Sequence, residues 1–447
     1  MEDKALATRV ILVRHGESSF NVERRIQGHL DKSTLTDKGI ADAQSVGQSL
    51  KDIPFNAIYH SPLTRARDTA AHICQQLQTP IQPQILNNLI EISLPLWEGI
   101  LFTEVKERDP QGYDNWHHHP EQLCMEIEGE NGPEQFFPVP ALYEQAQQVW
   151  DQLLPQHEGE TILLVGHSGI NRALLGTALG LTPERYHSLQ QANCNISVLN
   201  FTSGQPTQLE SLNLTGHTDL TLPKPRQGYD ALRLLLVRHG ETDWNRQGKF
   251  QGQIDVPLNE NGRLQGQQAA DFLQETPIDF AVSSSMLRPK ETAELILAHH
   301  PQVSLAVDDQ LREISHGKWE GCLEGEIERN YPGELERWQT TPAAVQMPDG
   351  ENIQQVWDRA VAAWEVLVKE KLRSGETGLV VAHDAVNKVI LCYLSGLGPE
   401  HIWSFKQGNG AVSVIDYTQE GKPTLAAMNI TTHLAGGVLD QTAAGAL

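Results

Sequence analysis

Two Arg-His-Gly-Glu segments, residues 14–17 and 238–241, are the parts of the sequence best suited to chemistry. An arginine guanidinium stays charged in proteins, and its planar fork matches the oxygens of a phosphate. The imidazole next to it can act as a nucleophile or carry a proton. This pairing indicates a site that binds a phosphoryl group and attacks it.

Each segment is followed, in the same order, by a second arginine, a glutamate and a second histidine. The glutamate could protonate a leaving alkoxide. Two arginines and a histidine could stabilise a transferring phosphoryl group without Mg²⁺. The sequence offers no plausible metal cage, so we expect no metal and no cofactor. The candidate catalytic residues are His15, Glu91, His167, His239, Glu313 and His383, and the candidate phosphate ligands are Arg14, Arg65, Asn21, Arg238, Arg288 and Asn245.

Weaker candidates for substrate contact flank these residues in both halves: Gln27, Gly28, Ser168, Gln251, Gly252 and Asp384. Asn171 and Asn387 follow the second histidines by four residues and suit helix capping as well as substrate contact. We expect Trp97 and Trp319 to pack beneath the sites. A run of three histidines at 117–119 is expected to be a solvated loop rather than a metal site, since the other half has no counterpart.

The candidate residues recur because the whole sequence repeats. VILVRHGESSFN returns as LLLVRHGETDWN, and TILLVGHSGINRAL returns as TGLVVAHDAVNKVI. His15 and His239 are 224 residues apart, and His167 and His383 are 216 apart. A repeat this long is a duplicated domain rather than a solenoid unit. We expect a domain at 1–216, a linker at 217–230, and a domain at 231–447 with a loosely held tail. The two halves are also expected to pack as an internal pseudo-dimer.

Short β-rich runs end directly before the candidate residues. Runs 9–13 and 232–237 precede the Arg-His pairs, 55–59 and 280–282 precede serine-rich turns, and 162–165 and 379–381 precede the second histidines. Continuous apolar runs separated by helical patterns predict an α/β fold, with a mostly parallel sheet flanked by helices on both faces. Ligands bind beyond the carboxyl ends of such strands, so each set should converge on one crevice.

With these motifs the sequence resembles the histidine phosphatase superfamily, which includes cofactor-dependent phosphoglycerate mutases, once in each half. The resemblance implies two tandem phosphoglycerate mutase-like domains and a phosphohistidine on His15 and on His239. The tandem form is similar to plant and cyanobacterial proteins described as 2-carboxy-D-arabinitol-1-phosphate phosphatases, on the stretches RHGESSFNVERRIQG and SSSMLRPKETAE. We expect a metal-independent phosphatase for a small sugar phosphate or sugar-acid phosphate. The alternatives are a phosphoglycerate mutase, or a chain in which one half only binds sugar phosphates or serves as a scaffold.

Each half departs from the family pattern in a different place. The Gly-x-x-Asp-x-Pro-Leu loop is intact at 252–258, whereas 28–35 has an extra residue and no proline. In the second half, Asp384 follows the second histidine, where the first half has Ser168. A carboxylate beside a phosphate pocket disfavours an anion. Two sites are therefore expected, but not two equally active ones.

Composition excludes several classes of partner. The 447 residues carry a formal charge of −23, which repels nucleic acid and anionic membranes. The five cysteines lie far apart and form no CxxC pair, and no run of 18 apolar residues occurs. We expect a cytoplasmic protein whose partner is a small phosphorylated sugar or sugar acid.

Overall fold

The computed structural model of the protein describes residues 7–78, 80–129, 132–434 and 437–443. It forms two compact units: the chain up to residue 207 together with 213–223, and residues 208–212 together with the chain from 224 onward. The predicted linker, 217–230, is described throughout, contains no helix or strand, and is divided between the units. The internal pseudo-dimer stays a prediction.

The sheet of the first unit has the strand order β7-β1-β6-β2-β3. The last four of these strands run parallel, and β7 is antiparallel to β1. The residues from Val10 to Val13 are fully buried, as expected for a strand covered on both faces. The strands are β1 (Thr8–Arg14), β2 (Ala57–His60), β3 (Gln84–Ile85), β6 (Thr161–Gly166) and β7 (Ile196–Phe201); β8 (Gln208–Leu214) is divided between the units.

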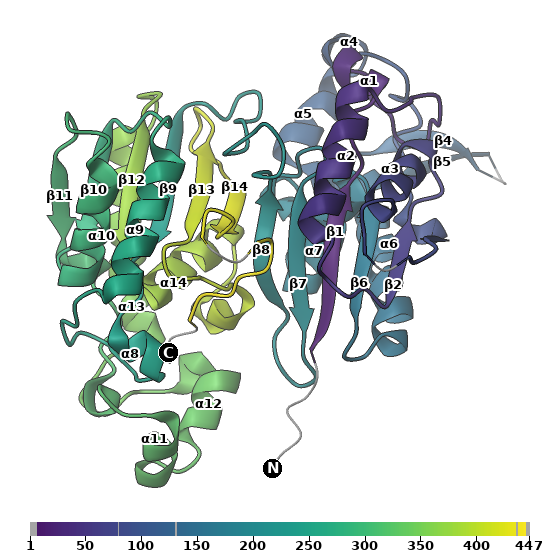
Figure 1. Cartoon of the computed structure of the whole chain (residues 1–447). Helices are drawn as coiled ribbons and strands as arrows, with labels where there is room; N and C mark the ends of the chain where they lie inside the picture. Colours follow the sequence, from purple (N-terminus) through teal and green to yellow (C-terminus); the bar gives the residue numbers. More distant parts are fainter. Residues whose placement is uncertain (1–6, 79, 130–131, 435–436, 444–447) are drawn as a thin grey trace. The chain divides into compact units, whose positions relative to one another are not determined.

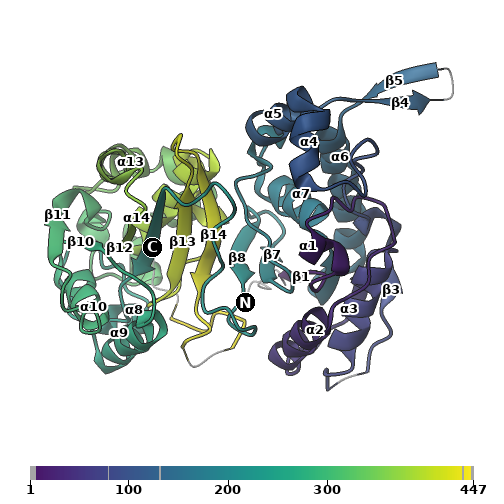
Figure 2. The ribbon, with the colours of Figure 1, turned by 90° about the horizontal axis from the view of Figure 1, so that it is seen from above.

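Helices cover both faces of this sheet, with α2 and α3 on one side and α6 and α7 on the other (Figure 2). α2 begins where the Thr36 side chain accepts a hydrogen bond from Gly39 N, and it buries Ala43, Val46 and Leu50 at the predicted helical spacing. The helices of the unit are α1 (Ser19–Glu23), α2 (Asp37–Leu50), α3 (Thr64–Cys74), α4 (Phe102–Arg108), α5 (Pro110–His118), α6 (Pro138–Leu153) and α7 (Ser168–Leu179).

The second unit repeats this plan, with the strand order β11-β10-β12-β9-β13-β14. The first four strands are parallel, and β13 runs antiparallel to both β9 and β14. The strands are β9 (Leu232–Arg238), β10 (Phe280–Ser284), β11 (Leu305–Asp308), β12 (Thr377–Ala382), β13 (Val412–Tyr417) and β14 (Pro423–Ile430).

In the second unit, α9 and α10 lie on one face of the sheet and α13 and α14 on the other (Figure 2), while α11 and α12 extend beyond it (Figure 1). The predicted fold, a mostly parallel sheet flanked by helices in each of two tandem domains, is therefore confirmed. The helices are α8 (Asp243–Gln247), α9 (Glu260–Leu273), α10 (Leu287–Leu297), α11 (Glu324–Asn330), α12 (Glu334–Thr340), α13 (Ile353–Lys371) and α14 (Asp384–Ser395).

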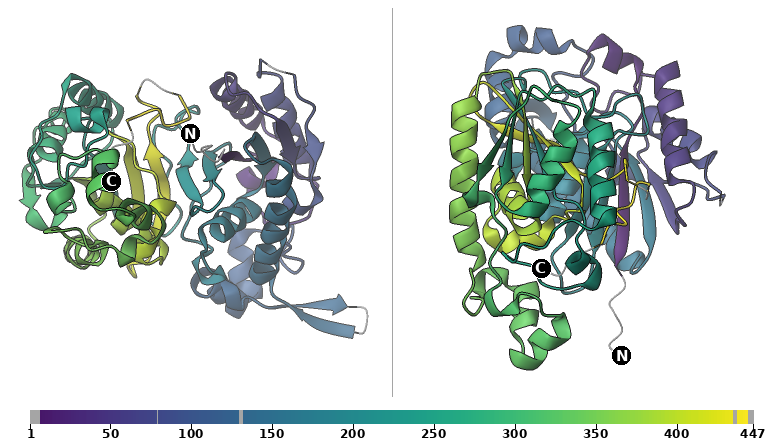
Figure 3. Two further views of the ribbon diagram at one scale, coloured as in Figure 1. Left: turned by 90° about the horizontal axis from the view of Figure 1, so that it is seen from below. Right: turned by 60° about the vertical axis from the view of Figure 1, so that its left-hand side comes forward.

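One element is particular to the first unit. The antiparallel hairpin of β4 (Met125–Gly129) and β5 (Gly132–Phe136) projects from it (Figure 3). The matching stretch of the second unit, 341–352, forms a 3-10 helix and turns instead. Among the described residues, none of the helices is both long and apolar enough to cross a membrane.

The second unit includes residues that precede the predicted linker. Leu212 pairs with Met428 of β14, and Asn429 Nδ2 donates to the Glu210 carbonyl at 2.8 Å. Asp440, in the tail predicted to be loosely held, donates from its backbone N–H to the Glu210 carboxylate at 3.0 Å. Residues 435–436 and 444–447 of that tail lie outside the described residues.

Candidate active sites

Strand register brings the two histidines of each half together. Arg14 at the end of β1 pairs with Gly166 at the end of β6, so His15 and His167 follow at the same edge of the sheet. Their ring centroids are 5.1 Å apart. In the second unit Arg238 pairs with Ala382, and the rings of His239 and His383 are 5.2 Å apart.

His15 is held in the state that a nucleophile needs. Its Nδ1 lies 2.7 Å from the Gly16 carbonyl oxygen, which can only accept, so Nδ1 carries the hydrogen and Nε2 the lone pair. Burial, and then the charges of Arg14 and Arg65, hold its pKa well below the ordinary value, so the ring is neutral at pH 7.

His239 has the same environment. Its Nδ1 lies 2.7 Å from the Gly240 carbonyl oxygen. Burial, Arg288 and Arg238 lower its pKa. Arg288 Nε donates to His239 Nε2 at 3.2 Å, so the lone pair of that nitrogen is engaged when no substrate is present.

The arginines of the first site, a buried Arg65 and a partly exposed Arg14, have donors left over. Arg65 donates to the carbonyls of Gly28 at 2.9 Å and Leu30 at 3.2 Å, and Arg14 donates to that of Gln191 at 2.8 Å. The Nε atoms of both arginines are buried and have no acceptor among the described residues. Burial lowers the pKa of Arg14 to about 10. An unsatisfied buried donor costs about 1–3 kcal/mol, which the oxygens of a bound phosphate would offset.

The second histidines are each held by a serine of the predicted serine-rich turns. Ser61 Oγ lies 2.7 Å from His167 Nε2, and Ser284 Oγ lies 2.9 Å from His383 Nε2. The opposite ring nitrogen, Nδ1, is buried in both histidines and has no described hydrogen-bond partner. These nitrogens add a further polar group to the candidate residues of each site.

The glutamates are seated at the amino ends of the helices that follow the second histidines. Glu91 accepts from the backbone N–H groups of Gly169 and Ile170, both at 3.1 Å, at the start of α7. Glu313 accepts from Asp384 N at 3.1 Å in the same way. Burial, and then the nearby Asp384 carboxylate, raise the pKa of Glu313.

A family model described as the histidine phosphatase superfamily (branch 1) matches residues 10–215 and again residues 234–431. The chain belongs to the histidine phosphatase superfamily. It is 30% identical over 448 residues to the 2-carboxy-D-arabinitol-1-phosphatase of Triticum aestivum, covering 96% of this chain and 87% of that protein. A probable 2-carboxy-D-arabinitol-1-phosphatase of Arabidopsis thaliana is 30% identical over 455 residues, covering 95% of this chain and 88% of that protein.

Among solved structures, YhfR of Bacillus stearothermophilus is 30% identical and covers 46% of this chain and 100% of its own, with a TM-score of 0.43. The family match and the full-length relatives make the chain a phosphomonoester hydrolase of the histidine phosphatase superfamily.

The candidate phosphate ligands Asn21 and Asn245 lie in α1 and α8, and the candidates Gln27 and Gln251 follow these helices. The oxygen of Asn21 accepts from Ser18 N at 3.0 Å, and that of Asn245 accepts from Thr242 N at 3.0 Å, so their amide nitrogens are left to donate. Gln27 Oε1 accepts from Ser33 Oγ at 2.7 Å, on the loop that has the extra residue. Gln251 is buried, and its Oε1 has no described partner.

Gly28 and Gly252 shape the arginine cradle through their backbone. Both have positive φ, of 50° and 56°, and both carbonyls accept from the second arginine of their site. A Cβ at either position would overlap the carboxylate of Glu98 or Glu320. These glycines are therefore required for the geometry of the arginine cradle, and their contact with substrate stays a prediction.

Sequence reasoning missed an asparagine in each site. Asn193 Nδ2 donates to the His15 carbonyl at 2.9 Å, and Asn409 Nδ2 donates to that of His239 at 3.2 Å. Gln191 and Gln407, which offer carbonyls to the first arginines, were missed too. Both pairs are 216 residues apart, like the second histidines, so a closer comparison of the halves would have found them.

Several minor expectations can also be placed. Neither Asn171 nor Asn387 caps its helix, since both lie inside one and their buried amides have no hydrogen-bond partner among the described residues. Trp97 and Trp319 are buried, as packing residues must be. The histidine run is not the predicted loop: it forms the end of α5 and its exposed C-cap, because the helical pattern continues through Trp116. Across the described residues, no group of three potential metal ligands occurs.

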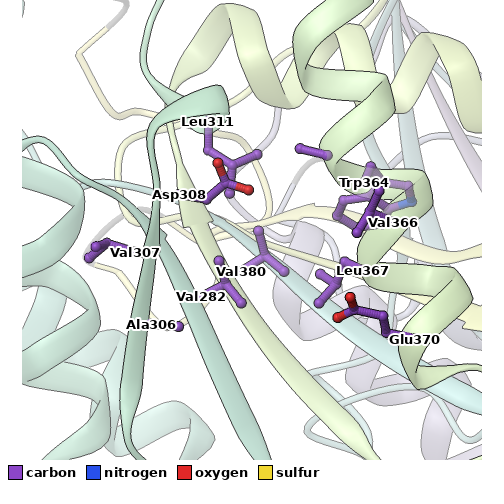
Figure 4. Close-up of a pocket in the computed structure, with 11 residues that line it drawn as sticks. Val282, Ala306, Val307, Asp308, Leu311, Trp364, Val366, Leu367, Glu370 and Val380 are labelled. Atoms are coloured by element: carbon purple, nitrogen blue, oxygen red, sulfur yellow. The ribbon is translucent and has the colours of Figure 1, made fainter.

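A cavity of about 440 Å³ borders the segment that carries Glu91. His29, which lines it, lies with Nε2 2.8 Å from the Glu91 carbonyl, and Gln145 donates to the Ile90 carbonyl at 2.8 Å. Ile127 and Phe136 of the hairpin complete its apolar wall. A second cavity, of about 220 Å³, lies between α13 and the strands β10 to β12 of the second unit (Figure 4) and contains none of the predicted site residues.

In the second unit, ionic groups occupy the position that corresponds to the first cavity. Arg359, the counterpart of Gln145, donates to the carbonyls of Arg312 at 2.6 Å and Glu313 at 3.0 Å. Its guanidinium also pairs with the Glu351 carboxylate at 2.8 Å. The two sites therefore share their candidate catalytic groups but differ in what surrounds them.

Proposed function

We propose that the chain hydrolyses a small sugar phosphate or sugar-acid phosphate through a phosphohistidine intermediate, without a metal ion. The observation that carries this proposal is a buried neutral imidazole, His15, whose Nε2 is free, together with arginine Nε and imidazole Nδ1 atoms that are buried and have no hydrogen-bond partner among the described residues. Such a set is preorganised for the oxygens of a phosphoryl group, since fixed positive groups need little rearrangement as charge develops.

In the first step, His15 Nε2 attacks phosphorus. The N–P bond forms while the P–O bond to the alcohol breaks. Glu91 transfers its proton to the leaving oxygen, so the alcohol departs neutral and Glu91 is left as a carboxylate. Arg14, Arg65 and His167 hold the phosphoryl oxygens during the transfer.

In the second step, the Glu91 carboxylate takes a proton from water as the water oxygen attacks phosphorus. The N–P bond breaks, its electron pair returns to Nε2, and inorganic phosphate is released. Glu91 is then protonated for the next cycle. His239, Glu313, His383 and the arginines of the second unit would perform the same steps.

The substrate class is inferred from the full-length relatives, whose names specify 2-carboxy-D-arabinitol 1-phosphate. We propose this compound, or a phosphorylated sugar acid like it, as the substrate. The five free cysteines are consistent with work in a reducing compartment, which we propose is the cytoplasm.

A non-catalytic second half is the one alternative that a specific observation favours. Asp384 places a buried carboxylate 3.5 Å from Arg238, where a phosphate would have to bind. Its repulsion of an incoming anion would weaken the second site without removing any catalytic group.

The test compares His15→Ala, His239→Ala and the double variant in phosphate release with EDTA present. The panel includes 2-carboxy-D-arabinitol 1-phosphate and other sugar phosphates, and the exposed His118→Ala is the control. We expect the double variant to lose release and each single variant to lose the acid-labile label of its own histidine. Full activity of the double variant would refute the mechanism. Formation of 2-phosphoglycerate from 3-phosphoglycerate, in place of phosphate release, would indicate a mutase.

A further inference from the structure

The helix after the second histidine carries different charges in the two units. α7 of the first unit has Ser168 and Arg172, and α14 of the second has Asp384 and Lys388. In both helices the two positions are four residues apart, so the side chains lie on one face. In the second unit that face includes Asp384, 3.5 Å from Arg238, and in the first unit the charge of Arg172 acts on Arg14.

In the second unit, Asp384 neutralises two buried cations. Its carboxylate lies 2.9 Å from Lys388 Nζ and 3.5 Å from an Arg238 terminal nitrogen. All three side chains are at most 8% exposed. Lys388 is also fixed over the Trp403 ring, 4.7 Å from its centroid. The carboxylate is therefore a built-in anion held between an arginine and a lysine.

In the first unit the matching cations lack such a carboxylate. Neither Arg14 nor Arg172 makes an ion pair among the described residues, and the counterpart of Asp384 is the uncharged Ser168. Arg172 is nevertheless held in place: its Nε donates to the Leu189 carbonyl at 2.9 Å, and its guanidinium lies 5.6 Å from the centroid of the Tyr186 ring. Its two terminal NH₂ groups make no hydrogen bond or ion pair with the part of the chain that the structure describes.

We propose that Arg172 binds a carboxylate of the substrate in the first site, and that the Asp384 side chain occupies the equivalent subsite in the second. The first site then takes phosphomonoesters of hydroxy acids, in which phosphate and carboxylate belong to one molecule. The second site takes phosphomonoesters without a second anionic group. This assignment rests on the proposed function and specifies which class of substrate each half accepts.

The test measures carboxylate preference, defined as kcat/KM for 3-phosphoglycerate divided by kcat/KM for glycerol 3-phosphate. His239→Ala isolates the first site, and His15→Ala isolates the second. In the first site, Arg172→Ala should lower the preference about 10- to 100-fold, as expected for a lost charge-assisted hydrogen bond. Arg172→Lys should lower it less, because the charge is kept. Arg108→Ala, which removes an exposed arginine, is the charge control.

The reciprocal exchange gives a second measurement that does not depend on losing an arginine. Ser168→Asp in the first site should lower the carboxylate preference about tenfold or more, and Asp384→Ser in the second should raise it by a similar factor. The assignment would be overturned if Arg172→Ala lowered kcat/KM equally for both substrates. It would also be overturned if neither Ser168→Asp nor Asp384→Ser changed the carboxylate preference.

Failure of the proposed function is a separate outcome. Without an acid-labile phosphohistidine on His15 or His239, the mechanism itself fails. If the label forms from both substrates and the preference does not respond to residues 168, 172 or 384, only the carboxylate subsite is refuted.

Discussion

Ser61→Ala tests whether the serine-rich turn positions the second histidine. Ser61 and His167 are both fully buried, and their Oγ and Nε2 atoms are 2.7 Å apart. Without the hydroxyl, His167 Nε2 would be buried with no partner, at a cost of about 1–3 kcal/mol. The bond from Leu63 N to Ser61 Oγ is long, at 3.3 Å, and adds little.

We therefore expect a loss of about 2 kcal/mol, which for a unit of this size lowers Tm by roughly 4–8 °C. A ring that has lost its anchor no longer holds its Nδ1 toward the phosphoryl oxygens. Misplacement of one such group should lower kcat by about 10- to 100-fold.

The assay uses the His239→Ala background, so that only the first site turns over, and combines phosphate release with thermal unfolding. Ser45→Ala is the control, since Ser45 Oγ bonds only the Ala41 carbonyl of its own helix. An unchanged kcat together with a lower Tm would show that Ser61 stabilises the unit but does not position His167, and would refute the reasoning.

Three further outcomes are expected. The first concerns Asp384→Ser in the His15→Ala background, which removes a charge that helps to raise the pKa of Glu313. The fall of kcat/KM at alkaline pH should therefore move to lower pH. A pH profile whose alkaline fall stays in place would contradict this expectation. The second concerns Gly28→Ala and Gly204→Ala, compared by urea unfolding. Both glycines have positive φ, but only Gly28 is crowded by a carboxylate. Gly28→Ala should therefore lower the free energy of unfolding by more than the roughly 1 kcal/mol expected of Gly204→Ala. Inorganic phosphate at a hundredfold excess over Kd should add about 2.7 kcal/mol of stability, and sodium chloride at equal ionic strength should not.

Much of the fold follows from local sequence signals. Val10 to Val13 form a continuous apolar run, as in a strand that is covered on both faces, and the polar residues Arg14 and His15 mark its end. The carboxyl ends of parallel strands meet at one edge of a sheet. The predicted ends of the strands were therefore enough to predict that His15 and His167 lie close together.

The rest depends on contacts that leave no local signal. Asn193 acts through the His15 carbonyl, so its importance comes from tertiary pairing rather than from its neighbours in sequence. The hairpin of β4 and β5 was not predicted, because it has no counterpart in the other half and a comparison of the two halves therefore gives no signal for it. Whether Asp384 points at Arg238 or away from it could be decided only in three dimensions.

The assignment of residues 208–212 to the second unit has a consequence for how the protein can be divided. Along the chain the two units alternate, because 208–212 belongs to the second and 213–223 to the first. A fragment that begins at Ala231 would lack Glu210 and leave Asn429 without the carbonyl to which it donates. A fragment that ends at Thr207 would lack 213–223 of the first unit. No single cut of the polypeptide releases both units whole, so a gene split at the linker would not encode two complete units.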